Sequence, residues 1–272
     1  MIKTLKYTFI ILLIFFACSS NSQTNNQDKK EKTSVVLKHK QKANIQIDTI
    51  KKIPLPEGFH RIIAKPNSFA EYLQNLKLKK DKTVYSYDGS IIMSKKYGYQ
   101  YAVIDIDIGN RDLQQCADAI MRLRAEYLYQ LKKYKEIHFN FSDGKARYFT
   151  SYSKSDYSYK KFRQYMNYIF AYANTATLKR ELHKVNISDM QIGDVFIQQG
   201  SPYGHAVIVI DMTENPLTGE KEFMVAQSFM PAQSIHIIKN PDKNNSPWYS
   251  LNFGKELRLP SWTFSQADLR RF

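Results

Sequence analysis

The sequence lacks the features that mark several common classes of protein. After residue 17 it has no apolar run long enough to cross a membrane, and it has no internal repeat. His60, His138 and His236 stand beside aromatic or aliphatic neighbours, without the His, Asp or Glu spacing of a metal site. No basic helix or ladder of aromatic and basic residues is present to bind nucleic acid. We therefore predict no metal, no cofactor and no nucleic-acid partner.

The apolar run at the N-terminus has the pattern of a targeting signal. In "MIKTLKYTFIILLIFFACSS", two lysines precede a run that is too short for a transmembrane helix and ends at Ala17 and Cys18. The pattern resembles the lipobox of bacterial lipoproteins, which is cleaved before the cysteine, although Phe15 stands where that motif usually has Leu. The resemblance implies a signal peptide over residues 1–17 and a lipidated Cys18 that anchors an exported protein to a membrane. An ordinary signal peptide or a signal anchor is the alternative.

Composition divides the rest of the chain into a tether and a domain. Residues 18–50 are polar, lysine-rich and nearly free of aromatic residues, which predicts a flexible tether. Residues 51–272 are rich in Tyr, Phe, Ile and Val, and they suffice for a single domain with a buried core. The net charge is +15. In an exported lipoprotein this favours anionic envelope polymers as partners, unless the lysines only solvate the surface. The oligomeric state is left open.

Helical and strand patterns are ordered along the domain. Apolar residues recur at helical spacing over residues 110–134, with Asp112 as the expected N-cap. A second helical stretch covers residues 161–182, with a break near Asn174. Four strands then follow, over residues 195–198, 206–212, 222–227 and 234–238. Helices followed by an antiparallel meander predict the α+β class.

Cys116 is the most informative residue for chemistry, because a lipidated Cys18 leaves it without a disulfide partner. It lies shortly after the expected N-cap, where the helix N-terminus lowers a thiol pKa. His205 follows the turn-like "GSPYG" and begins a strand of Ala, Val and Ile, so it can serve as a base that also favours the thiolate. A hairpin places Gln227 within about a residue of the register of His205, where its amide oxygen can orient the imidazole. We predict Cys116, His205 and Gln227 as the catalytic residues.

The neighbours of these residues are the expected substrate contacts. Tyr203 and Gly204 lie in the loop directly before His205, and Ser228 follows Gln227 on the next strand. We predict Tyr203, Gly204 and Ser228 as substrate-binding residues. Backbone N–H groups at the start of the helix, including that of the cysteine, would stabilise an oxyanion.

This arrangement resembles the NlpC-type papain-like cysteine peptidases, which cut the stem peptides of peptidoglycan. The likeness rests on the lone cysteine at a helix start, on "IGDVF" and "GHAVIVI", and on a polar residue in the following strand. It implies a papain-like core with N-terminal helices packed on an antiparallel meander. It also implies Cys116 as nucleophile, His205 as base and Gln227 as the third residue. "QQCADA" departs from the "DCSG"-like turn of that family, and an extra strand and helix separate Cys116 from His205.

A second likeness covers nearly all of residues 50–272. The phrases "LPEGFHRI", "QQCADAIMRLRAEYLY", "GDVFIQQGSPYGHAVIVIDM" and "AQSFMPAQSIHII" resemble a set of uncharacterised lipoproteins of Bacteroidetes-type bacteria. This resemblance names a family and implies no activity.

Three hypotheses from different classes follow from the sequence. The first is a cysteine hydrolase of the cell envelope, lipid-anchored at the periplasmic face or the cell surface, that cleaves amide bonds in peptidoglycan-type peptides. The second is a non-catalytic envelope lipoprotein that binds peptide or glycan through a degenerate papain-like cleft. The third is a structural or assembly factor that acts through its basic surface.

Overall fold

The computed structural model describes residues 46–200 and 203–272. The predicted signal peptide, the lipidation site Cys18 and most of the predicted tether lie outside these described residues. The end of that tether belongs to the fold, because Ile50 is fully buried and Thr49 pairs with Lys77. The folded unit therefore begins a few residues before position 51. Within the described part of the chain, no helix has the length and apolar character needed to cross a bilayer.

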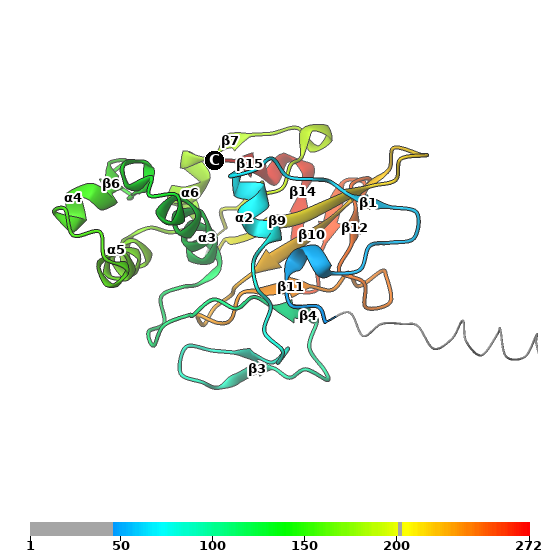
Figure 1. The fold of residues 1–272 in the computed structure, drawn as a ribbon, viewed down its shortest axis with the longest axis horizontal. Helices are drawn as coiled ribbons and strands as arrows, with labels where there is room; N and C mark the ends of the chain where they lie inside the picture. The colour runs from blue at the N-terminus through cyan, green and yellow to red at the C-terminus, as the bar shows by residue number, and fades with distance from the viewer. Residues whose placement is uncertain (1–45, 201–202) are drawn as a thin grey trace, which may run out of the picture. The chain divides into compact units, whose positions relative to one another are not determined.

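The fold combines short helices with many strands (Figure 1). The α-helices are α2 (Phe69–Gln74), α3 (Cys116–Gln130), α4 (Phe149–Ser153), α5 (Tyr159–Tyr172) and α6 (Thr175–Glu181). Single-turn 3₁₀ helices are η1 (Ile50–Lys52), η2 (Tyr134–Glu136), η3 (Ile187–Asp189) and η4 (Gln266–Asp268). The strands are β1 (His60–Arg61), β2 (Val84–Tyr85), β3 (Ile91–Met93), β4 (Gln100–Val103), β5 (His138–Asn140), β6 (Ala146–Tyr148), β7 (His183–Lys184), β8 (Val195–Gln198), β9 (His205–Glu214), β10 (Lys221–Gln227), β11 (His236–Ile238), β12 (Tyr249–Ser250), β13 (Glu256–Arg258), β14 (Thr263–Ser265) and β15 (Leu269–Arg271).

Nine of the strands form one antiparallel sheet with β9 and β10 at its centre. The order is β4-β11-β10-β9-β8-β15-β7, and β1 and β12 pair with β9 and β10. Residues of β9 alternate between two covered faces, as a pleated strand requires. Ile208 packs with Leu123 of α3 in one core cluster, whereas Val207 packs with Phe264 of β14 in a second. Figure 1 shows α3, α4, α5 and α6 gathered at one end of the sheet.

Helix α3 is shorter than its sequence pattern predicted. The apolar spacing extends over residues 110–134, but the helix begins at Cys116 with Gln115 as its N-cap. Asp112, the expected cap, instead accepts a hydrogen bond of 2.7 Å from the backbone N–H of Ala232. A contact with a distant loop has therefore taken the capping side chain, which places Cys116 at the first helical position.

The other local signals correspond closely to the structure. The predicted break near Asn174 separates α5 from α6, and the Asn174 side chain caps α6 by accepting from Thr177 N at 3.0 Å. The strand predicted over residues 195–198 has those bounds, and that over residues 206–212 extends to 205–214. The architecture is mixed, with α-helices and a large antiparallel sheet.

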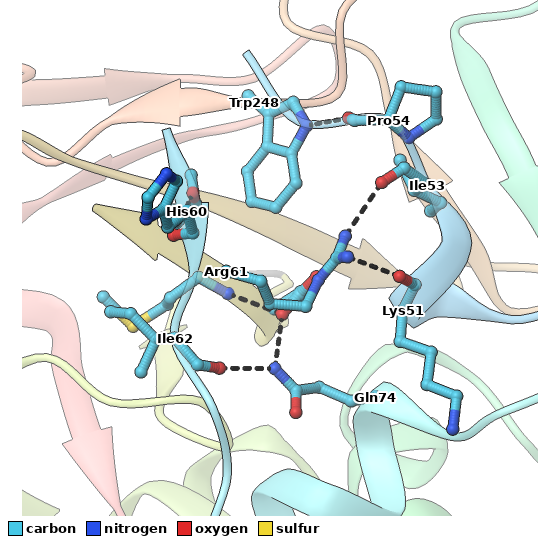
Figure 2. Close-up of polar contacts among 11 residues, drawn as sticks. Lys51, Ile53, Pro54, His60, Arg61, Ile62, Gln74 and Trp248 are labelled. Atoms are coloured by element: carbon cyan, nitrogen blue, oxygen red, sulfur yellow. Dashed lines mark hydrogen bonds and ion pairs between the residues drawn. The ribbon is translucent and has the colours of Figure 1, made fainter. Parts of the chain in front are cut away.

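A buried ion pair attaches the N-terminal segment to the centre of the sheet. Arg61 Nε donates to Asp211 Oδ2 at 2.7 Å, and the Asp211 side chain has no exposed surface. Gln74 Nε2 donates to the other oxygen of Asp211 at 2.8 Å. Figure 2 shows the Arg61 guanidinium also directed at the carbonyl groups of Lys51 and Ile53, both of which accept from it. Burial raises the pKa of Asp211, and the nearby Arg61 opposes that rise.

Replacing Arg61 tests how strongly this ion pair holds the segment. Arg61→Ala leaves a carboxylate fully buried without its cation, so we expect a loss of about 3 kcal/mol in the free energy of unfolding by denaturant. Lys52→Ala removes an exposed ion pair with Asp48 and is the matched control, and its effect should be much smaller because solvent screens the pair. Equal and small effects of the two substitutions would show that the buried pair contributes little.

Candidate active site

Cys116 occupies the first turn of α3, at the end of the helix that carries unpaired backbone N–H groups. Its side chain is 7% exposed, and it is the one free cysteine among the described residues. The sulfur lies 3.8 Å from the Thr175 hydroxyl of α6. The predicted nucleophile is therefore held between two helix starts, α3 and α6, in a largely desolvated position.

His205 and Gln227 meet as the sequence predicted. His205 Nε2 lies 2.8 Å from Gln227 Oε1, and both side chains are 1% exposed. Ala226 pairs with Ile208, so Gln227 stands diagonally across from His205 on the same face of the sheet. The residues are brought together by ordinary hairpin register.

The hydrogen bonds around Gln227 determine which nitrogen of His205 is free to act as a base. His236 Nδ1 lies 2.9 Å from the Ser234 carbonyl oxygen, which can only accept, so Nδ1 carries the proton and Nε2 is an acceptor. Gln227 Nε2 lies 3.2 Å from His236 Nε2 and donates to it, which directs Gln227 Oε1 at His205. His205 Nε2 must then donate. Its Nδ1 keeps the lone pair that a general base requires.

The thiol and the imidazole line the same small cavity at the end of β9. This cavity has a volume of about 80 Å³, and its remaining walls are Tyr203, Gly204, Phe229, Met230 and Trp262. Strand alternation places His205 on the face opposite α3, where its ring lies 5.2 Å from that of Trp262. Both groups line this cavity at the start of β9.

Gly204, directly before His205, lies so close to neighbouring segments that a side chain would not fit there. A Cβ at position 204 would lie 2.3 Å from the Gln198 carbonyl oxygen and 3.1 Å from Thr175 Cγ2. The absence of a side chain at Gly204 lets the loop pass between β8 and α6 directly before His205.

Cys116 also lines a larger cleft of about 440 Å³. Its walls are the start of α3, the end of α5 with the start of α6, and four residues before β9, namely Gln199, Gly200, Tyr203 and Gly204. The predicted substrate contacts Tyr203 and Gly204 line both this cleft and the small cavity, and Tyr203 is 62% exposed. Cys116 therefore lines both the cleft and the small cavity that contains His205.

Ser228 is not placed to bind substrate, which corrects the prediction. It has no exposed surface, and its hydroxyl lies 2.8 Å from the Gln233 carbonyl oxygen and 3.2 Å from that of Gln114. Ser228 thus joins the turn after β10 to the segment before α3. It faces neither the cleft nor the small cavity.

The protonation states of the site differ from those expected from the sequence. Burial raises the pKa of the Cys116 thiol, and this outweighs the opposing hydrogen bonds from Thr175 and from the backbone of Ala117 and Ala206. Burial lowers the pKa of His205 to about 4, although its hydrogen bond to Gln227 acts in the opposite direction. The resting pair is therefore a neutral thiol and a neutral imidazole. The thiolate–imidazolium pair inferred from the helix N-terminus does not form at rest, because desolvation penalises both ions.

Several residues of the site escaped the sequence reasoning. Thr175 and Trp262 reach the thiol and the imidazole from α6 and from the C-terminal segment, and no local pattern connects them to Cys116. His236 could have been found, because a hairpin between β10 and β11 pairs it with Gln227. The sequence analysis considered this histidine only as a metal ligand and so did not connect it to Gln227.

A second cavity of about 440 Å³ lies between α2 and α3 and contains none of the predicted site residues. Its charged groups include Arg122, which is paired with Glu126 at 2.6 Å, and Asp107, which lies 3.9 Å from Arg163. Within residues 46–200 and 203–272, no three His, Cys, Asp or Glu side chains lie together as metal ligands would. The thiol and the base therefore assign the candidate site to the cleft beside Cys116.

Comparison with known proteins identifies a family. Residues 49–155 and 145–271 match the family described as a domain of unknown function (4846), so the match extends over most of the chain. No curated protein matches the chain. No solved structure matches it.

Acid should destabilise the fold through the two buried histidines. The pKa values of His205 and His236 are about 4 in the folded protein, whereas an unfolded histidine titrates near 6.5. Between pH 6.5 and 4 the unfolded chain therefore binds more protons than the folded protein. The free energy of unfolding should fall over this range by up to about 3 kcal/mol for each ring. Denaturant unfolding between pH 4 and 7 should show this fall. His236→Gln should reduce the fall, whereas His183→Gln, at an exposed histidine, should leave it unchanged.

The thiol should be slow to alkylate at neutral pH. Because burial raises the pKa of Cys116, iodoacetamide should modify it more slowly at pH 7 than it modifies a cysteine in a short peptide. The rate constant should still be rising at pH 9, as followed by mass spectrometry of the Cys116 peptide. A rate that levels off below pH 8 would instead indicate a preformed thiolate.

Proposed function

Since the chain belongs to the family described as a domain of unknown function (4846), whose description names no chemistry, we propose a function from the geometry of the site. The protein is a cysteine hydrolase of the bacterial cell envelope that cleaves amide bonds in peptidoglycan-type peptides. The hydrogen-bond chain from His236 through Gln227 to His205 carries this proposal. It ends at a basic nitrogen whose ring shares a cavity with a thiol at a helix start.

In the proposed reaction, proton transfer accompanies nucleophilic attack. His205 Nδ1 takes the thiol proton as the sulfur of Cys116 bonds to the scissile carbonyl carbon. The backbone N–H group of Cys116, which has no intrahelical acceptor at the first position of α3, stabilises the oxyanion. The imidazolium then returns its proton to the amine leaving group. A water molecule, deprotonated by the same nitrogen, hydrolyses the thioester and releases the acid.

The neutral resting pair suits this sequence of events. A thiolate and an imidazolium are unfavourable inside the desolvated cavity when no substrate is bound. When the sulfur attacks a substrate carbonyl, the negative charge moves to the carbonyl oxygen, where backbone N–H donation can stabilise it. Gln227 keeps His205 in the productive tautomer, and Ser261 lies 3.3 Å from the Gln227 amide nitrogen as a further restraint. The papain-like architecture inferred from the sequence is part of the proposal. The helix that carries Cys116 packs on an antiparallel sheet whose next strands carry His205 and then Gln227.

The proposed location rests on the N-terminal sequence. The lipobox-like segment ending at Cys18 supports export and a lipid anchor, at the periplasmic face or the cell surface. The net charge of +15 supports a location beside anionic envelope polymers such as peptidoglycan. A hydrolase held there would meet peptide substrates without a further targeting element.

The raised pKa of Cys116 favours one alternative, a non-catalytic lipoprotein that binds peptide or glycan in the same cleft. A thiol that stays protonated with a ligand bound would occupy the cleft floor without reacting. The two functions differ in what replacement of the sulfur does.

Replacing the nucleophile should abolish hydrolysis and preserve the fold. With purified peptidoglycan fragments as substrate and mass spectrometry of the products, Cys116→Ser should lower the rate by about 10³-fold or more. Gln227→Ala should lower it less, by about tenfold to a hundredfold, because it frees the imidazole without removing it.

Melting temperature provides the control for these variants. Cys116→Ser should melt close to the wild type, and Ser228→Ala is a matched variant at a buried residue outside the cleft that should keep its activity. Fragment binding without hydrolysis, unchanged in Cys116→Ser, would support the non-catalytic alternative and overturn the enzyme.

A further inference from the structure

A residue that lines the cleft has a buried carboxylate oxygen without a partner. Asp118, two residues after Cys116 in the first turn of α3, is 8% exposed and lines the cleft. Its Oδ2 accepts from the Gln115 backbone N–H at 3.1 Å, which completes the cap of the helix. Its Oδ1 is buried and has no hydrogen-bond partner. Buried carboxylate oxygens are rarely left unpaired, and such an exception calls for an explanation.

The charge of the cleft is opposite in sign to that of the chain. The charged side chains among its described lining residues are Asp112 and Asp118, and none of those residues is Lys or Arg. The whole chain, by contrast, has a net charge of +15. Asp112 Oδ1 already accepts from the Ala232 backbone N–H and from the side chain of Gln115. Asp118 shares the first turn of α3 with Cys116 and has a buried carboxylate oxygen without a partner.

We propose that Asp118 is a specificity-determining residue that binds a primary ammonium group of the substrate, so that the enzyme prefers peptides carrying a free amine close to the scissile amide. This inference rests on the proposed function and deepens it. An ammonium donates to a carboxylate oxygen in a charge-assisted hydrogen bond, which is strong in a partly desolvated site. Asp118 and Cys116 share one helical turn, so the amine lies near the carbonyl that the sulfur attacks.

The cap function of Asp118 alone does not account for these observations. A cap requires one acceptor, and Asn in place of Asp would satisfy Gln115 N equally well. Burial raises the pKa of Asp118 well above its ordinary value, so the carboxyl is held at an energetic cost in the absence of a cation. A bound ammonium would offset that cost and pair the free oxygen.

Small thiol-modifying reagents of matched size test the inference without requiring a known substrate. Methanethiosulfonates carrying 2-aminoethyl, 2-hydroxyethyl or 2-sulfonatoethyl groups each transfer their thioalkyl group to a thiolate and release methanesulfinate. The rate constant of each reagent with Cys116 in the purified protein is divided by the rate constant of the same reagent with 2-mercaptoethanol. Mass spectrometry distinguishes the Cys116 peptide from the Cys18 peptide. The cationic reagent should exceed the neutral one by about tenfold or more.

Variants assign the preference to one carboxylate. Asp118→Asn keeps the cap acceptor and should remove most of the ratio between cationic and neutral reagents. Its absolute rates should rise, because Asp118 raises the pKa of Cys116. Asp107→Asn, which removes an exposed carboxylate outside the cleft, should keep the ratio. If Asp118→Asn does not fold, the wild-type ratio alone decides the question.

The possible results separate the two proposals. Equal normalised rates for the three reagents in the wild type, or an unchanged ratio in Asp118→Asn, would overturn amine recognition and leave the hydrolase standing. Failure of all three reagents to reach Cys116 until the protein is denatured would overturn the accessible nucleophile, and amine recognition with it.

Discussion

Burial of the central strand β9 is the constraint on which the rest of the structure depends. Its first nine residues are buried, so every polar side chain among them must find a partner inside the protein. Asp211 pairs with Arg61, which attaches the N-terminal segment to the sheet, and the Thr213 hydroxyl donates to the carbonyl group of His60. His205 forms a hydrogen bond with Gln227. The same requirement thus organises a structural attachment at one end of the strand and a candidate active site at the other.

Desolvation also defines the chemistry that the site can perform. It raises the pKa of Cys116 and lowers that of His205, so the helix N-terminus does not produce a resting thiolate. Reactivity then depends on groups that stabilise charge only when substrate is bound. In the reaction we propose, the first turn of α3 supplies an N–H group to the oxyanion and the Asp118 carboxylate to a cation. Proposed recognition and proposed catalysis would then share one helix start.

Much of the site could be predicted because it depends on local rules. Hairpin register between neighbouring strands brings Gln227 to His205. This register can be predicted from the sequence, because the lengths of the strands and of the closing turn set it. The break between α5 and α6 follows from the capping preference of Asn174. The start of α3 was misplaced because Asp112, a good cap in isolation, is taken by the backbone of Ala232, which is distant in sequence.

The sequence by itself therefore indicated the two long helical stretches, the four strands of the meander with the pairing of adjacent strands, and the thiol, the imidazole and the amide as candidates. Only the tertiary structure decided how deeply these groups are buried, that Ser228 faces inward, and that His236 completes the hydrogen-bond chain. The physical reason is that propensity and register act between near neighbours along the chain. Desolvation, by contrast, depends on all the atoms that distant segments place around a group, and it sets the protonation state of Cys116 and His205.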